Sequence, residues 1–203
     1  MQALLKLSRG IDWVNTQVGK YVIWLILAST VISGVNAVVR KAFNHRSNGF
    51  LEVQWYLFAA AFLLAAGQTL LQGEHVKVDG VASRLSKRAQ MWIDIFGFVF
   101  FLTPVCLVIL WYGVPFFIQG FTSSEMSSNA GGLLRWPVYL MMPLGFGLLL
   151  LQGLSEMIKR LAFLQGLIDD PTAKKAEKSA EEELAEAIRR VAEAGKANKA
   201  GQA

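Results

Sequence analysis

The chain has 203 residues, of which 54% are hydrophobic and only 17% are charged, and its net charge is +5. A soluble domain of this length carries about 25% charged residues, so the composition argues against one. The charges avoid four long apolar blocks and flank them instead, as expected of a chain whose solvent is lipid. Lipid headgroups therefore explain the basic balance better than nucleic acid does. The sequence predicts an all-α integral membrane protein with four transmembrane helices.

Residues 1–18 alternate apolar and polar side chains at helical spacing. Leu4, Leu7 and Val14 share one face, whereas Lys6 and Asp12 lie off it. This pattern predicts an N-terminal amphipathic helix lying at the membrane interface. An ordinary soluble helix has the same spacing and stays an alternative.

The four apolar segments lie at residues 21–39, 51–73, 91–117 and 136–158, within a transmembrane domain that we place at 19–160. At ~1.5 Å per residue the first segment rises ~28 Å, close to the hydrocarbon thickness of a bilayer. The long patterned stretch before it favours an uncleaved anchor over a signal peptide. Pro104 removes a backbone donor and should distort the third helix one turn earlier.

Small side chains recur at helical spacing on the first two segments. Such faces let helix backbones approach closely in lipid, so they are candidate subunit interfaces. They serve equally well to pack the two helices on each other. The candidate interface residues are Ser29, Ser33 and Ala37 on the first segment and Ala61 and Ala65 on the second.

Residues 161–203 form a charged cytoplasmic tail in this interpretation. Pro171 ends any helix that continues from the fourth segment. Ser179 and Glu182 fit a capping box, which predicts a further helix before a disordered end.

The distribution of lysine and arginine predicts the topology. Nine lie near the segment ends on the side of the N-terminus, the 74–90 loop and the tail, against four on the other side. Because the richer side faces the cytoplasm, both termini should be inside, and the 40–50 and 119–135 loops should face outward.

The sequence contains no residue pattern typical of an enzyme active site or a cofactor site. His45 and His75 fall on opposite sides of the membrane in this topology, and no acidic or cysteine pair in the spans has metal-ligand spacing, so we expect no metal or cofactor. Two acids, Glu52 and Asp94, lie at segment ends. Glu52 could meet a cation of a partner subunit, Arg40 of its own chain, or the dipole of its own helix. A lone carrier would need charge or broken helices at the midplane, which favours an accessory subunit.

The segment junctions resemble a known family. A basic-aromatic-Asn turn, a glutamate at the start of span two and a His-x-x-x-Asp turn after it are similar to the small membrane subunit of tripartite ATP-independent periplasmic (TRAP) transporters, the dicarboxylate-transporter small-subunit type. The similarity covers about residues 10–160 and leaves out the tail. The residues that carry it are Arg40, Asn44, Glu52, Trp55, Gly73, His75 and Asp79.

This resemblance implies a bacterial inner-membrane protein that performs no chemistry. Its partners would be a large multi-span permease, a periplasmic solute-binding protein and membrane lipids, and the complex would take up an organic acid with an ion gradient. The polar outer loop then offers Ser123, Ser124 and Glu125 as candidate contacts for the binding protein, unless it is a bare connector. The alternatives are a membrane-anchor subunit of another complex, which would need haem or quinone ligands, and a stand-alone channel, which would need a continuous polar stripe.

Overall fold

The computed structural model describes residues 2–43, 48–73, 85–129, 132–170 and 188. These residues are helical apart from short loops and one isolated antiparallel bridge between Met126 and Leu134. The elements are α1 (Gln2–Phe43), α2 (Asn48–Gln72), α4 (Lys87–Gly97), the π-helical turn η1 (Phe98–Leu102), α5 (Thr103–Thr122) and α6 (Trp136–Leu164). Since α4, η1 and α5 are continuous, four helical segments are long and apolar enough to cross a membrane. This confirms the predicted all-α class with four such helices.

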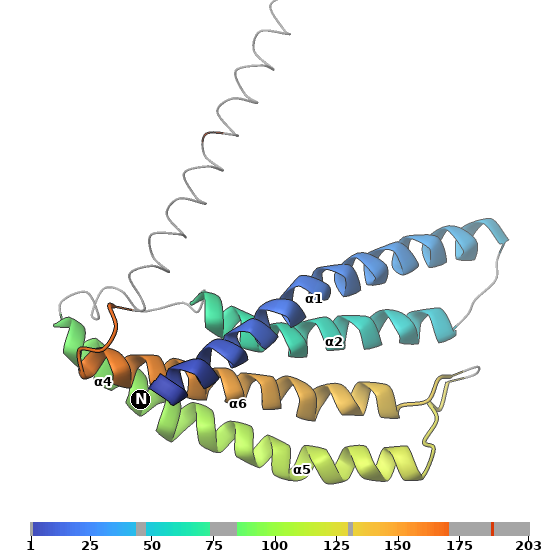
Figure 1. Ribbon diagram of the computed structural model, residues 1–203. Coiled ribbons are helices and arrows are strands. Elements are labelled where there is room, and N and C mark those ends of the chain that lie inside the picture. Colours follow the sequence, from blue (N-terminus) through green and yellow to red (C-terminus); the bar gives the residue numbers. More distant parts are fainter. Residues whose placement is uncertain (1, 44–47, 74–84, 130–131, 171–187, 189–203) are drawn as a thin grey trace, which may run out of the picture.

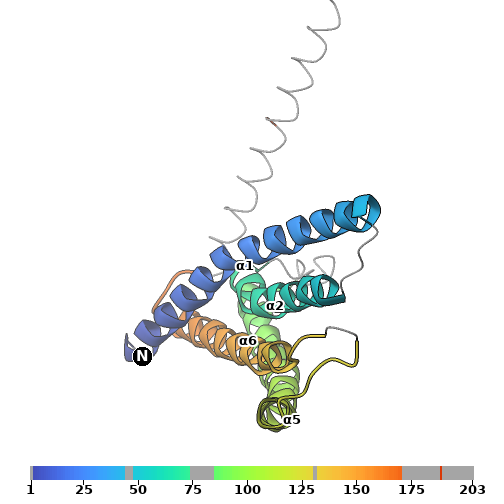
Figure 2. The same ribbon diagram turned by 90° about the vertical axis from the view of Figure 1, so that its right-hand side faces the viewer.

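Helix α6 lies at the centre of the arrangement. It packs against α2 and α5 along its length, and α1 crosses both α2 and α6. Figure 1 shows that the N-terminus, the start of α4 and the end of α6 lie at one end of the molecule. The end of α1, the start of α2, the end of α5 and the start of α6 lie at the other end. Figure 2 shows α1 running obliquely past α6 and α2.

The N-terminal amphipathic segment is continuous with the first span. Helix α1 has 42 residues and no break near residue 18, where we placed a domain boundary. At ~1.5 Å per residue it is ~63 Å long, about twice the ~30 Å hydrocarbon core. Its predicted apolar face is exposed, with Leu7 at 56%, whereas Ser8 and Asn15 are buried. The side of the helix that carries Ser8 and Asn15 therefore makes the protein contact.

The third span is distorted where Pro104 predicts it. Residues 98–102 form a π-helical turn directly before the proline, which stands in the first turn of α5. Proline cannot donate a backbone hydrogen bond to the preceding turn, and a π-helical turn is a common way to absorb such a defect.

Close helix contacts depend on glycine in α6. A Cβ atom added at Gly145 would lie 2.6 Å from the carbonyl oxygen of Leu63 on α2. A Cβ atom at Gly153 would lie 2.7 Å from a methyl group of Leu102. These contacts let α2 and the π-helical turn approach α6 more closely than a larger side chain would allow.

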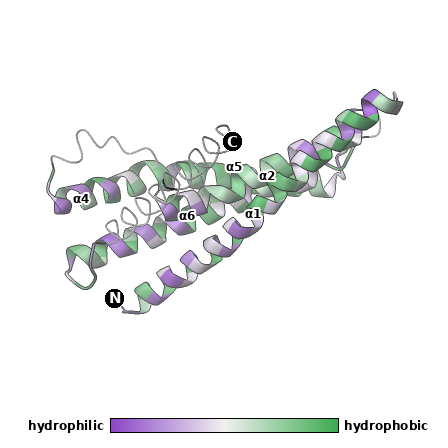
Figure 3. Cartoon of the chain, turned by 90° about the horizontal axis from the view of Figure 1, so that it is seen from above, coloured by the Kyte–Doolittle hydropathy of each residue, from purple (hydrophilic) through white to green (hydrophobic). Residues whose placement is uncertain are grey.

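Hydropathy follows the long axis of the bundle. Figure 3 shows apolar residues predominating along the middle of the helices and polar ones towards the end that carries the N-terminus. Many large apolar side chains of the spans are exposed, among them Trp111 at 77% and Phe62 at 73%, as expected of surfaces that meet lipid or another membrane subunit. The predicted capping box at Ser179 and the predicted tail helix, apart from Ile188, lie outside the described residues.

Candidate functional site

The junction motif residues lie at the ends of α1 and α2. Arg40 is exposed in the last turn of α1, and Trp55 is half-exposed in α2 with its ring edge-on to Tyr56 at 4.3 Å. Gly73 follows α2 with a φ of 75°, a left-handed conformation that favours glycine at the end of a helix. Its N–H donates to the carbonyl of Thr69 at 3.1 Å. Asn44, His75 and Asp79 lie outside the described residues.

Glu52 is buried near the start of α2 and holds the loop between α5 and α6. Its side chain is 1% exposed. One carboxylate oxygen accepts hydrogen bonds from the hydroxyl of Ser127 and, at 2.8 Å, from the side-chain amide of Asn129. The other oxygen accepts the backbone N–H of Leu133 at 2.7 Å. No ion pair joins Glu52 to Arg40, although both are described. The partners of Glu52 therefore differ from the three that the sequence suggested, namely a partner subunit, Arg40 and the dipole of its own helix.

The same loop forms a short hairpin. We call residues 125–129 and 132–135 the outer hairpin. Its arms are joined by backbone hydrogen bonds from Ser127 to Leu133 and from Arg135 to Glu125, both 2.9 Å. The hydroxyl of Tyr56 on α2 donates to the carbonyl of Leu134 at 3.1 Å.

An ion pair closes the base of the outer hairpin. Arg135 donates to the carboxylate of Glu125 at 3.0 Å, and the hydroxyl of Tyr139 donates to the same oxygen. Hydrogen bonds with Tyr139 and Glu125 raise the pKa of Arg135 above its ordinary value. Glu125, a candidate contact for a binding protein, is therefore already paired within the chain. Ser123 and Ser124 are exposed, and Ser124 has a φ of 49°.

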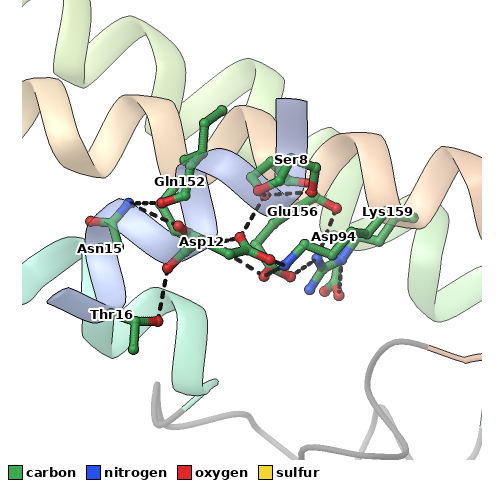
Figure 4. A network of polar contacts seen from close by, with 11 residues as sticks. Ser8, Asp12, Asn15, Thr16, Asp94, Gln152, Glu156 and Lys159 are labelled. Atoms are coloured by element: carbon green, nitrogen blue, oxygen red, sulfur yellow. Dashed lines mark hydrogen bonds and ion pairs between the residues drawn. The ribbon is translucent and has the colours of Figure 1, made fainter. Parts of the chain in front are cut away.

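A second polar cluster joins α1 to α6 at the opposite end (Figure 4). The hydroxyls of Ser8 and Ser155 are 2.7 Å apart. Asp12 accepts hydrogen bonds from Ser155 at 2.7 Å and from the amide of Gln152 at 2.9 Å, and it pairs with Lys159 at 2.8 Å. We call this group, with Asn15, Glu156, Arg160 and Asp94, the inner cluster.

Arg160 extends the inner cluster to the third span. Its guanidinium binds Glu156 at 2.7 Å and Asp94 of α4 at 2.8 Å. It also lies over the ring of Phe98, 4.7 Å from the centroid. Glu156 is 1% exposed and also pairs with Lys159 at 2.7 Å. One cluster of side chains therefore ties α1, α4, η1 and α6 together.

Most residues of this cluster are not among the candidates predicted from the sequence. Of the acids in the spans, Glu52 and Asp94 were considered and Glu156, which lies inside the fourth segment, was not. A signal was available, because Ser8, Asp12 and Asn15 lie three and four residues apart, as do polar residues on α6. Polar residues at that spacing in an apolar helix indicate a contact between helices. The α6 set is Gln152, Ser155, Glu156 and Lys159.

The small-residue faces lie between α1 and α2. Ser29 is buried, and its hydroxyl donates to the carbonyl of Gln54 at 3.1 Å. Ala61 is 3% exposed, and with Ala65 it lines an apolar groove of about 440 Å³ between α1, α2 and α6. Ser33 and Ala37 line a second groove between α1 and α2. Some of these residues thus pack the two helices on each other, which is the alternative to a subunit interface that the small-residue pattern left open.

The described residues hold no group of three or more histidines, cysteines or acids that could bind a metal ion. A family model described as "Tripartite ATP-independent periplasmic transporters, DctQ component" matches residues 29–163. The chain belongs to this family. The resemblance seen in the junction motifs is thereby confirmed. No curated protein and no solved structure matched the chain.

Membership of the DctQ family indicates the type of protein, its location and its partners. The DctQ component is the small membrane subunit of a TRAP transporter, a transporter component rather than an enzyme. The family and the four apolar helical segments indicate a multi-pass inner-membrane protein. The family also implies partnership with a large permease subunit and a periplasmic binding protein. The family match includes the outer hairpin and most of α6 but not residues 2–28 of α1.

Proposed function

We propose that this DctQ component braces the large permease while the complex takes up an organic acid, driven by an ion gradient and dependent on a binding protein. The observation that carries the proposal is the family match over residues 29–163. The contacts of the inner cluster support it. Its acids Asp12, Asp94 and Glu156 all pair with Lys159 or Arg160 of the same chain. These charges hold helices together, as suits a scaffold.

Both termini face the cytoplasm in this proposal. The nine-to-four bias of lysine and arginine supports that orientation. The outer hairpin, at the end of the molecule opposite the N-terminus (Figure 1), then lies in the periplasm. Ser123 and Ser124 stay candidate contacts for the binding protein there, together with Glu125 in its paired form.

The permease contact is proposed along the small-residue face of α1 and α2, where close backbone approach is possible. Ala37 is the sharpest probe because it is exposed, whereas Ala61 already packs within the chain. Ala37→Leu should reduce co-purification with the permease in mild detergent. Val38→Leu, at an exposed neighbouring position, is the matched control. Full retention of the permease by Ala37→Leu would remove this face from the interface. The carboxylate of Glu52, the remaining candidate interface residue, already accepts hydrogen bonds within the chain.

The main test is reconstitution in liposomes. The complex of this chain and its permease, with a sodium or proton gradient and a substrate-loaded binding protein, should accumulate a labelled organic acid. The chain alone should accumulate none. Saturable, gradient-driven uptake by the chain alone would overturn the accessory role. Uptake by the complex at the same rate without the binding protein would overturn the tripartite mechanism.

A further inference from the structure

We propose that Glu52 is a positioning residue, which fixes the shape of the outer hairpin so that the substrate-loaded binding protein can dock on it. The inference rests on the proposed function. It adds a specific residue, inside a helix, on which docking outside the membrane depends.

The hydrogen bonds of Glu52 reach both arms of the outer hairpin. Ser127 and Asn129 on the first arm bind one oxygen of its carboxylate, and the backbone of Leu133 on the second arm binds the other. These partners lie 75 to 81 residues further along the chain. Because carboxylate hydrogen bonds are charge-assisted, they are stronger than those between neutral groups.

The outer hairpin also has other contacts, most of them within the hairpin itself. Among its described residues, three backbone hydrogen bonds, one bridge and the Arg135–Glu125 ion pair join the arms, and Tyr56 of α2 donates to Leu134. A two-stranded hairpin of this size is marginal on its own in water. The Glu52 carboxylate is 1% exposed, so these hydrogen bonds are shielded from competing water. The hairpin therefore takes three of its hydrogen bonds, spread over both arms, from one buried residue of the membrane domain.

A preformed hairpin favours docking because its conformational entropy is already lost before the partner binds. The outer hairpin presents Met126 at 62% exposure and Leu134 at 41%, next to each other across the bridge. It lies at the end of the molecule that the proposed topology places in the periplasm. The family supplies one soluble partner on that side, the binding protein.

The test uses Glu52→Gln in the reconstituted complex with its permease. Glutamine keeps the size of the side chain but replaces one acceptor oxygen with an amino group, so it cannot accept from both arms. Uptake is measured at increasing concentrations of loaded binding protein. The concentration for half-maximal uptake should rise about tenfold, while the maximal rate and co-purification with the permease stay unchanged. Thr69→Val, which removes one hydroxyl hydrogen bond at the other end of α2, is the control and should change neither.

A second variant separates positioning from a general loss of packing. Met126 and Leu134 form a pair flanked by, and not sharing, the backbone hydrogen bonds of the hairpin. Cα atoms of such pairs are ~4.5 Å apart, within the range of a disulfide. In Glu52→Gln with M126C and L134C, oxidation should restore the half-maximal concentration to that of the same cysteine pair with Glu52 present. Reduction should abolish the rescue. The natural Cys106 is buried and should not interfere.

The outcomes are distinguishable. If the wild-type complex shows no uptake that depends on the binding protein, the proposed function falls and the inference falls with it. If the wild type works and Glu52→Gln has the same half-maximal concentration, the inference alone is overturned. It is also overturned if Glu52→Gln lowers only the maximal rate, or if the disulfide brings no rescue.

Discussion

Arg160 of the inner cluster links Glu156 on its own helix to Asp94 on α4. Its side chain is 6% exposed, and it binds the 1% exposed Glu156 and the partly exposed Asp94. Removing one partner of a buried ion pair typically costs ~3–5 kcal/mol, because the other charge stays buried without compensation. Arg160→Met should therefore lower the free energy of unfolding by about that amount, measured by denaturant titration in mild detergent.

Two comparisons check this explanation. Lys87→Met removes an ion pair with Asp170 at 3.6 Å in which the lysine is 62% exposed, so it should cost less than ~1 kcal/mol. Arg160→Met combined with Glu156→Met removes both buried charges and should cost less than Arg160→Met alone. A double variant that loses the sum of both single effects would show that the pair is not coupled.

The sequence identifies single residues that need a partner but does not identify the partner. Glu52 stood out because a carboxylate at the start of an apolar helix needs a partner. Its partners could not be predicted, because Ser127 and Leu133 are 75 and 81 residues away and meet it only when α2 packs on α6. The candidate docking residue Glu125 looked free for the same reason, since its pairing with Tyr139 depends on how the hairpin joins α6.

At the scale of helices, the contact between α2 and α6 depends on Gly145. A Cβ atom there would lie 2.6 Å from the carbonyl oxygen and 2.8 Å from the Cβ atom of Leu63, so a backbone must shift. Gly145→Ala should cost ~1–3 kcal/mol, as overpacking typically does. Thermal denaturation in detergent, followed by loss of helical circular dichroism, measures it.

Gly147 provides the matched control two residues along the same helix. A Cβ atom at Gly147 meets nothing within 4 Å. Gly147→Ala should therefore leave stability unchanged or raise it by up to ~1 kcal/mol, because alanine favours a helix more than glycine does. Equal losses from the two substitutions would show that the close approach of α2 and α6 is not what glycine provides at 145.

The helices themselves follow from simple sequence features, and their contacts do not. Apolar length alone predicted four membrane-crossing segments, and Pro104 marked the distortion of the third. The amphipathic pattern of the first 18 residues identified a helix with two faces but not which face would meet protein. In the structure Ser8 and Asn15 form buried hydrogen bonds to α6, and the helix continues without a break into the first span. Periodicity does not distinguish lipid from protein on the apolar side.

The orientation of the whole molecule can be tested with two exposed positions at opposite ends. Met126 in the outer hairpin is 62% exposed, and Leu167 after α6 is 55% exposed. The cation bias places position 126 outside and position 167 inside. In cells that produce the complex, a membrane-impermeant thiol reagent should label Met126→Cys and leave Leu167→Cys unlabelled until the membrane is opened.

Background from the natural cysteine should be small, because Cys106 is buried in the third span. A Cys106→Ala background removes what remains, since alanine leaves no thiol for the reagent. Each single-cysteine variant is labelled before and after permeabilisation. A position on the far side of the membrane becomes labelled only after permeabilisation, whereas a position covered by a partner stays unlabelled in both conditions. Labelling of position 167 but not of position 126 in intact cells would reverse the topology. The outer hairpin would then face the cytoplasm, out of reach of any periplasmic protein, and the role proposed for Glu52 in docking would be excluded as well.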